Sequence, residues 1–180
     1  NSMSEDMLNI VNSKYILKNV TINRVLSDAI DFDFSNGSID NIKISNVGGD
    51  ALDFSGGIST VSNANIFNVK DKAFSAGEES YLTIHKSEIS DVVVGVASKD
   101  GSQVSVFNTL FKDVTLSPAM TFIKKSFYEA PKLVLQSCDI DANSDLIAQT
   151  GTSILVDGVQ IETQDVNVEK LYQSDVMKNE

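Results

Sequence analysis

The chain has 180 residues, a formal net charge of -11 and a single cysteine, and 42% of its residues are hydrophobic. This length fits one domain or part of a repeat array, and the apolar content excludes wholesale disorder. One cysteine excludes an internal disulfide and a cysteine-based zinc site, no apolar stretch is long enough for a membrane helix, and the acidic balance argues against nucleic-acid binding.

A segment of alternating apolar and polar residues recurs along the chain with a period near 22 residues. Its central apolar residues are separated by 22, 22, 23, 22, 29 and 21 positions. Such alternation is typical of a β-strand with one buried face, and seven copies in register indicate stacked structural repeats. The seven central residues are Ile22, Ile44, Ile66, Ile89, Phe111, Ile140 and Ile161.

A second alternating segment occupies the other half of each repeat. Its first three copies, at residues 6–10, 28–32 and 50–54, contain aspartates, whereas the copies at 72–76 and 94–98 keep the spacing and lose the acids. Gly, Asn, Ser and Asp bound both segments, which indicates turns between short strands. No repeat contains an amphipathic helical stretch, which argues against a leucine-rich repeat.

These features predict an all-β fold, a parallel β-helix solenoid of about seven rungs with a period near 22 residues. In such a solenoid each side chain stacks on its counterpart one rung away, roughly 4.8 Å along the axis. The inward columns are predicted to be Val20-Ile42-Ala64, Ile22-Ile44-Ile66-Ile89-Phe111, Val25-Val47-Val69-Val92-Val114 and Leu8-Ile30-Leu52-Phe74-Val96.

The stacked Ile and Val columns, together with an asparagine column, resemble the right-handed parallel β-helix superfamily, to which pectate lyases belong. Asparagine suits such a turn column because it tolerates left-handed backbone. Segments 49–56, 71–78 and 95–101 look like uncharacterised β-helix domains of bacterial secreted or cell-envelope proteins. The resemblance therefore implies a fold and an extracellular or cell-envelope location in a bacterium. The asparagine column consists of Asn19, Asn41, Asn63, Lys86 and Asn108.

Four aspartates form the sharpest candidate site, because Asp28 should stack on Asp50 and Asp31 on Asp53. Like charges on neighbouring strands need a cation, a lysine or solvent screening, and carboxylates from two rungs suit calcium. The resemblance implies two chemistries, since lyases of the superfamily use calcium sites and its glycosidases use clustered aspartates. We favour a structural role, because aspartate at a turn bonds its own backbone. Calcium binding by these four residues and catalysis are the alternatives.

Few other residues suggest chemistry. Lys70 and Lys72 lie one rung from the acidic column and are expected to neutralise it; a lysine base beside calcium is the alternative. Arg24 and His85 fall on different rungs, in columns that should face solvent, so neither is assigned a catalytic role. Cys138 aligns with inward positions and is expected to be a small core residue. No residue is therefore assigned to catalysis from the sequence.

The step of 29 residues predicts an insertion near residues 121–131. It combines Lys124 and Lys125 with Phe127 and Tyr128 in an otherwise acidic chain. Aromatic rings stack on sugars and lysines pair with uronate or sulfate groups, so these four residues are the candidate ligand-binding residues. The alternative, which we favour, is a loop that folds its aromatics over the adjacent rung.

The pattern changes after residue 164. We expect the β-helix to occupy residues 1–164 and a C-terminal cap or tail to occupy residues 165–180. This segment is predicted to form a short amphipathic helix or a final irregular rung, with Val168, Leu171, Tyr172 and Met177 on one face.

The sequence favours a non-catalytic β-helix module of a bacterial secreted or cell-envelope protein, acting as a rigid scaffold or as a surface that binds carbohydrate or a protein partner. Such modules often accompany other domains of a longer chain. The alternative is a calcium-dependent polysaccharide lyase or a glycoside hydrolase acting on acidic polysaccharide. The favoured interpretation needs no cofactor, and the lyase alternative needs calcium.

Overall fold

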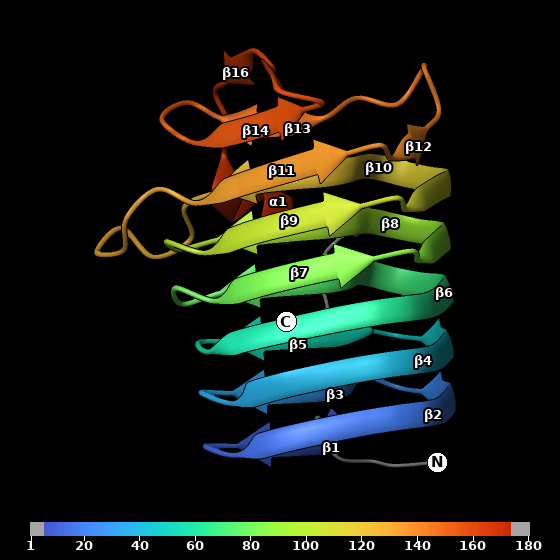
Figure 1. Cartoon of the computed structure of the whole chain (residues 1–180). Helices are drawn as coiled ribbons and strands as arrows, with labels where there is room; N and C mark the ends of the chain where they lie inside the picture. Colours follow the sequence, from blue (N-terminus) through green and yellow to red (C-terminus); the bar gives the residue numbers. More distant parts are fainter. Residues whose placement is uncertain (1–5, 174–180) are drawn as a thin grey trace.

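A computed structural model describes residues 6–173, which form a solenoid of stacked rungs. Figure 1 shows the strands rising in chain order from the N-terminal end to the C-terminal end. Strands of successive rungs pair in parallel, and only β15 pairs antiparallel, with β14, within the described residues. The predicted all-β solenoid of about seven rungs is confirmed.

Long strands alternate with short ones because a single strand often continues around a corner of the rung. The long strands are β2 (Lys14–Val25), β4 (Asn36–Val47), β6 (Ile58–Gly77), β8 (Glu88–Lys99) and β10 (Leu110–Phe122). The shorter strands of the same rungs are β1 (Asp6–Val11), β3 (Asp28–Asp33), β5 (Leu52–Ser55), β7 (Tyr81–His85), β9 (Gln103–Phe107) and β11 (Lys132–Gln136). The C-terminal elements are β12 (Asp139–Ile140), β13 (Ile147–Gln149), β14 (Ser153–Val156), β15 (Val159–Gln160), β16 (Thr163–Gln164) and α1 (Val168–Gln173).

The rungs have three sides, each a parallel stack of strand segments. We call them the first side (residues 14–18 and the segments stacked on it), the second side (20–25 and its stack) and the third side (6–11 and its stack). The third side continues through β3 and β5 into the C-terminal parts of β6, β8 and β10. It carries the aspartates singled out in the sequence.

The predicted register is confirmed along the central column. Ile44 pairs with Ile22 on one side and Ile66 on the other, and the pairing continues through Ile89 and Phe111 to Ile140. Buried side chains of these columns form one continuous core, which encloses Ile44 completely. Stacked aliphatic columns of this kind remove most of their apolar surface from water, and that burial is the main favourable contribution to folding.

Three of the predicted inward positions are less buried than the rest. Leu8, on the first rung, is 39% exposed, and Val20 and Val114 are only partly buried against the core. Cys138 is also half-buried rather than enclosed, although it packs against the core as expected. The thiol donates weakly to the carbonyl of Val106 at 3.6 Å. These positions lie near the ends of their columns, where fewer neighbouring rungs cover them.

Turn columns of left-handed backbone mark the corners of the rungs. The asparagine column has φ between 49 and 58° throughout, and the Asn41 amide donates to the Asn19 amide oxygen at 2.7 Å. The column of Arg24 also has positive φ, from 50 to 63°. The sequence predicts that this column faces solvent, but it does not predict the left-handed backbone conformation. The residues of this second column are Arg24, Asn46, Asn68, Asp91 and Asp113.

Helix α1 lies against the outer surface of the third side rather than across the end of the solenoid. Val168, Leu171 and Tyr172 pack against a patch of buried apolar residues there, so three of the four predicted face residues share a face. The fourth, Met177, lies outside the described residues. The patch consists of Val94, Ala97, Met120 and Phe122.

Candidate functional site: a polar pocket on the third side

The outer surface of the third side brings the four predicted aspartates together. Asp31 pairs with Asp53 in the strand register, and Asp28 stacks one rung from Asp50. The two stacks have different surroundings. The first stack, of Asp28 and Asp50, accepts hydrogen bonds from the backbone, whereas no such bond is found for the unpaired Oδ1 atoms of the second. Asp50 Oδ2 is also buried without a partner among the described residues.

The carboxyl groups of Asp28 and Asp50 each accept a hydrogen bond from the backbone of the rung that follows. Oδ1 of Asp28 accepts the backbone N–H of Asp50 at 2.6 Å, and Oδ1 of Asp50 accepts the backbone N–H of Lys72 at 2.9 Å. Burial raises the pKa of Asp28 to about 6, against the lowering effect of this hydrogen bond. This column is therefore a ladder of side-chain to backbone bonds between rungs.

Lys72 balances the charge of the buried part of this ladder. Its Nζ lies 3.2 Å from Asp50 Oδ1 and 2.9 Å from Asp71 Oδ2. The expected neutralisation of the acidic column by Lys72 is thus confirmed at Asp50, whereas Lys70 is exposed. Burial, and after it the charges of Asp71 and Asp53, raise the pKa of Asp50 well above its usual range, although Lys72 opposes them.

Asp31 and Asp53 form the second stack. The Oδ1 atom of each is buried and has no hydrogen-bond partner among the described residues. Burial raises the pKa of Asp31 to about 7, and the neighbouring charge of Asp53 adds to the effect. Two adjacent carboxyl groups with buried, unpaired oxygens therefore lie on neighbouring rungs of the third side.

The insertion predicted near residues 121–131 is a loop between β10 and β11 that stands out from the rod (Figure 1). Asp100 anchors it, because Oδ1 of Asp100 accepts the backbone N–H groups of Lys124 and Lys125 at 2.7 and 2.8 Å. Lys125 forms an ion pair with Glu78. Lys124 lies over the ring of Tyr172, 4.3 Å from its centroid.

The loop and one of the four predicted aspartates, Asp53, meet at a polar pocket of about 120 Å³. Three lysines and three acids contribute to its wall, so charges of both signs face the same small space. Phe127 and Tyr128, which follow the loop lysines in the sequence, do not line the pocket. Their rings contact each other, with centroids 4.6 Å apart, and Phe127 is 79% exposed. The lining residues are Asp53, Ser55, Gly77, Glu78, Lys99, Asp100, Lys124 and Lys125.

A metal centre made of protein ligands alone is not formed. Within residues 6–173, no three His, Cys, Asp or Glu side chains lie close enough together to hold a metal ion. Calcium prefers six to eight oxygen ligands, so Asp31 and Asp53 need water or a ligand to complete a site. Calcium binding by the aspartates stays a prediction.

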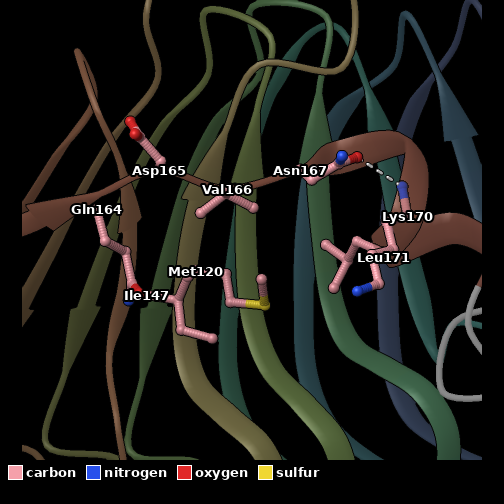
Figure 2. Close-up of a pocket in the computed structure, with 8 residues that line it drawn as sticks. All are labelled: Met120, Ile147, Gln164, Asp165, Val166, Asn167, Lys170 and Leu171. Carbon is pink, nitrogen blue, oxygen red and sulfur yellow. Dashed lines mark hydrogen bonds between the residues drawn. The ribbon is translucent and has the colours of Figure 1, made fainter.

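A second, more apolar pocket of about 350 Å³ lies where the C-terminal segment crosses the third side. Figure 2 shows Met120 and Ile147 at its base and the chain from Gln164 to Leu171 around it. Oδ1 of Asn167 accepts the backbone N–H of Lys170 at 2.9 Å and so caps the start of α1. The repeat pattern does not predict this pocket.

The described fold and the repeat agree with a comparison against known families. Residues 6–168 match the family described as a right-handed β-helix region. The chain belongs to the right-handed β-helix family. No curated protein matches the sequence.

The remaining residues of this β-helix that could do chemistry are dispersed. His85 lies on the first side, where its ring stacks on Phe107 with centroids 5.0 Å apart. Arg24 lies at a turn of the second side and is exposed. Neither lines the polar pocket. No helix in the described part of the chain is long and apolar enough to cross a membrane.

Sequence reasoning missed Glu78, Lys99 and Asp100, which complete the polar pocket. Asp100 was one of several turn residues around Gly101, and nothing in its spacing marks it as the anchor of a loop 24 residues further on. The absence of acidic residues from segments 72–76 and 94–98 was the one sequence signal that this part of the third side is covered. Those outward positions lie towards the loop and α1 instead of open solvent.

Proposed function

We propose that this β-helix is a non-catalytic binding module of a bacterial secreted or cell-envelope protein, and that its polar pocket binds acidic carbohydrate. The observation that carries the proposal is the pocket itself, in which the loop lysines and Asp53 share one space. Other domains of a longer chain would supply any catalysis. The solenoid holds the pocket on a rigid rod.

The chemistry of the pocket suits a sugar that carries negative charge. Lys124 and Lys125 are suited to pair with a carboxylate or sulfate group, while the carboxylate of Asp53 accepts hydrogen bonds from hydroxyl groups. The exposed ring of Phe127 offers a flat apolar surface for the face of a sugar ring. Asp100 fixes the loop backbone, so little ordering is needed when the ligand binds.

Calorimetric titration with uronate oligosaccharides tests this proposal. We expect Lys124→Met to weaken binding by about tenfold to a hundredfold, because a charge-assisted hydrogen bond contributes about 1.5–3 kcal/mol. Lys112→Met removes an exposed lysine from the second side and should leave affinity unchanged. Neutral oligosaccharides should bind more weakly than uronates of the same length. Equal affinity of Lys124→Met and the unmodified protein for uronates would exclude the pocket.

A glycoside hydrolase or a calcium-dependent lyase is the second candidate, favoured by one observation. Asp31 and Asp53 are register partners on adjacent strands and have buried, unpaired oxygens, and the raised pKa of Asp31 leaves it as the protonated member. Strands about 4.8 Å apart place two carboxyl groups near the separation of about 5–5.5 Å found in retaining glycosidases.

Activity assays distinguish this candidate from the binding module. A hydrolase should release reducing ends from acidic polysaccharides and lose that activity in Asp31→Asn. A lyase should produce unsaturated products that absorb in the ultraviolet, and calcium should raise its melting temperature. Binding of uronates without either product supports the non-catalytic module.

A further inference from the structure

Gly77 lines the polar pocket, and neither the backbone nor the packing of the solenoid requires a glycine there. Its φ lies outside the left-handed region, and among residues 6–173 an added Cβ would come within 4 Å of one atom beyond its chain neighbours, Cε of Lys99 at 3.5 Å. The chain has ten glycines, and each of the other nine either has positive φ or would place an added Cβ within 2.4 Å of a neighbouring atom. Gly77 is therefore the one glycine that alanine can replace without a clash or backbone strain.

The same position carries a side chain on the neighbouring rungs. Asp33 pairs with Ser55, and Ser55 pairs with Gly77 in the strand register. The column continues into Lys99, because the residues just before Gly77 and Lys99 are register partners. Aspartate, serine and lysine thus occupy this backbone position elsewhere in the solenoid. Glycine weakens a strand, and it often marks a bulge, a bend or the close approach of a ligand or another backbone.

The bulge, the bend and the close backbone contact do not account for this glycine. The register shift between β6 and β8 lies between Val69 and Lys72. The turn that follows Gly77 is formed by Glu78 and Glu79, which have φ of 57 and 61°. Within residues 6–173, no backbone atom beyond the chain neighbours lies within 4 Å of an added Cβ. What the missing side chain provides is space, and that space belongs to the polar pocket.

We infer that Gly77 sets the specificity of the polar pocket by admitting the charged substituent of a sugar, a carboxylate or sulfate group, while the sugar ring stays outside. This inference rests on the proposed binding of acidic carbohydrate. The pocket measures about 120 Å³, which is less than the cavity of about 150 Å³ that holds one benzene molecule. A sugar ring with its hydroxyl groups is larger than benzene, whereas a carboxylate or sulfate group is smaller.

A group that enters the pocket above Gly77 meets the end of the Lys99 side chain. Cε of Lys99, which carries the ammonium nitrogen, lies 3.5 Å from the position of an added Cβ, and Lys99 is only 6% exposed. An ammonium group has three N–H donors, so it can bind an anionic substituent and keep its contacts within the protein. Charge-assisted hydrogen bonds are about twice as strong as neutral ones. The absence of a side chain at residue 77 therefore gives the ligand access to a buried lysine.

The acids of the pocket wall have contacts of their own. Glu78 forms an ion pair with Lys125, and Asp100 accepts the backbone N–H groups at the start of the loop. Asp53 is suited to accept hydrogen bonds from the hydroxyl groups of the sugar. The pocket therefore combines a small opening for the charged substituent with an acceptor for the rest of the ring.

Calorimetric titration of Gly77→Val with uronate oligosaccharides tests the inference. The two methyl groups of valine fill the space above Gly77, so uronate affinity should fall by about tenfold or more, to that of neutral oligosaccharides of the same length. Ser105→Val introduces the same side chain on the first side, outside the pocket, and should leave the affinity unchanged. Unchanged uronate affinity in Gly77→Val would overturn the role of Gly77 and leave the proposed binding intact. If the unmodified protein binds no uronate, the proposed function fails, and this inference fails with it.

Thermal unfolding distinguishes this role from a structural one. Gly77→Ala should raise the melting temperature by about 1–4 °C, because alanine restricts the unfolded chain and its Cβ fits the folded protein. Gly95→Ala is the matched comparison on the adjacent strand β8. It should lower the melting temperature, since its Cβ would lie 2.4 Å from the carbonyl oxygen of Pro118. A similar fall for Gly77→Ala would show that the fold requires this glycine and would overturn the inference.

Discussion

Asp50 binds both ends of Lys72, since its Oδ1 atom accepts the backbone N–H at 2.9 Å and the side-chain Nζ at 3.2 Å. One rung earlier, Asp28 accepts the backbone N–H of Asp50 in the same way, at 2.6 Å. The aspartates that stand out in the repeat are therefore connected along the solenoid axis. Their carboxyl groups bind the backbone of the next rung, and charge repulsion between them is reduced by that bonding and by the lysine.

The hydrogen bond from Asp28 can be tested separately from its charge. Asp28→Ala removes the acceptor and leaves the backbone N–H of Asp50 unpaired, so we expect a loss of about 1–3 kcal/mol in the free energy of unfolding. Asp28→Asn keeps an oxygen at the same place and should cost much less. Urea denaturation of the two variants measures the difference. Equal losses would show that the charge, and not the acceptor, matters at this position.

A charge in the central column should unfold the middle of the solenoid. Ile44 is fully buried and pairs with Ile22 and Ile66, so Ile44→Asp places a carboxyl group among aliphatic side chains. We expect a loss of about 4 kcal/mol or more, seen as a lower urea midpoint. Ile16→Asp is the matched control, because Ile16 is 72% exposed, and it should change stability by less than about 0.5 kcal/mol. An unchanged midpoint for Ile44→Asp would contradict the inward assignment.

The inward columns and the asparagine turns could be predicted because each rung repeats the same local requirement. An apolar residue stacks on an apolar residue, and asparagine recurs where the backbone is left-handed. The column of Arg24, Asn46 and Asp91 has the same backbone conformation, yet its mixed residues resemble an ordinary exposed strand. A repeated pattern reveals a turn only where a residue that tolerates positive φ is itself repeated.

The polar pocket could be predicted only in part, because it depends on contacts that do not repeat. Asp53 and the loop lysines were singled out separately, and their meeting depends on Asp100, which folds the loop onto the third side. The packing of helix α1 on that side also depends on contacts that do not repeat, those of Val168, Leu171 and Tyr172. The loss of acids at residues 72–76 and 94–98 is the one signal in the repeat that the surface there is covered.

Stability should depend on pH through Asp31. Burial and the charge of Asp53 raise its pKa from 3.8 to about 7 in the folded protein. Between these two pH values, Asp31 keeps its proton in the folded state and releases it in the unfolded state. The contribution of this proton to the free energy of unfolding is therefore complete below about pH 4 and is lost as the pH rises to about 7. Melting temperatures across this range measure the effect.

Replacement of Asp31 by asparagine should weaken this pH dependence, because asparagine stays neutral in both states, while Asp28, whose pKa burial raises to about 6, still contributes in the same range. Glu88→Gln removes an exposed carboxylate from the second side and serves as the control. If Asp31→Asn and Glu88→Gln show the same decline in melting temperature between pH 4.5 and pH 7.5, the proton is not held by Asp31.

The anchoring of the loop by Asp100 predicts a change in local order with little change in the core. Asp100→Ala removes the acceptor for the N–H groups of Lys124 and Lys125, so the loop should open and trypsin should cleave after these lysines several-fold faster. Asp100→Asn keeps one oxygen acceptor and should be cleaved more slowly than Asp100→Ala. Because the pocket shares these lysines, Asp100→Ala should also weaken uronate binding. Cleavage at the original rate would mean that the ion pair of Lys125 with Glu78 is enough to hold the loop.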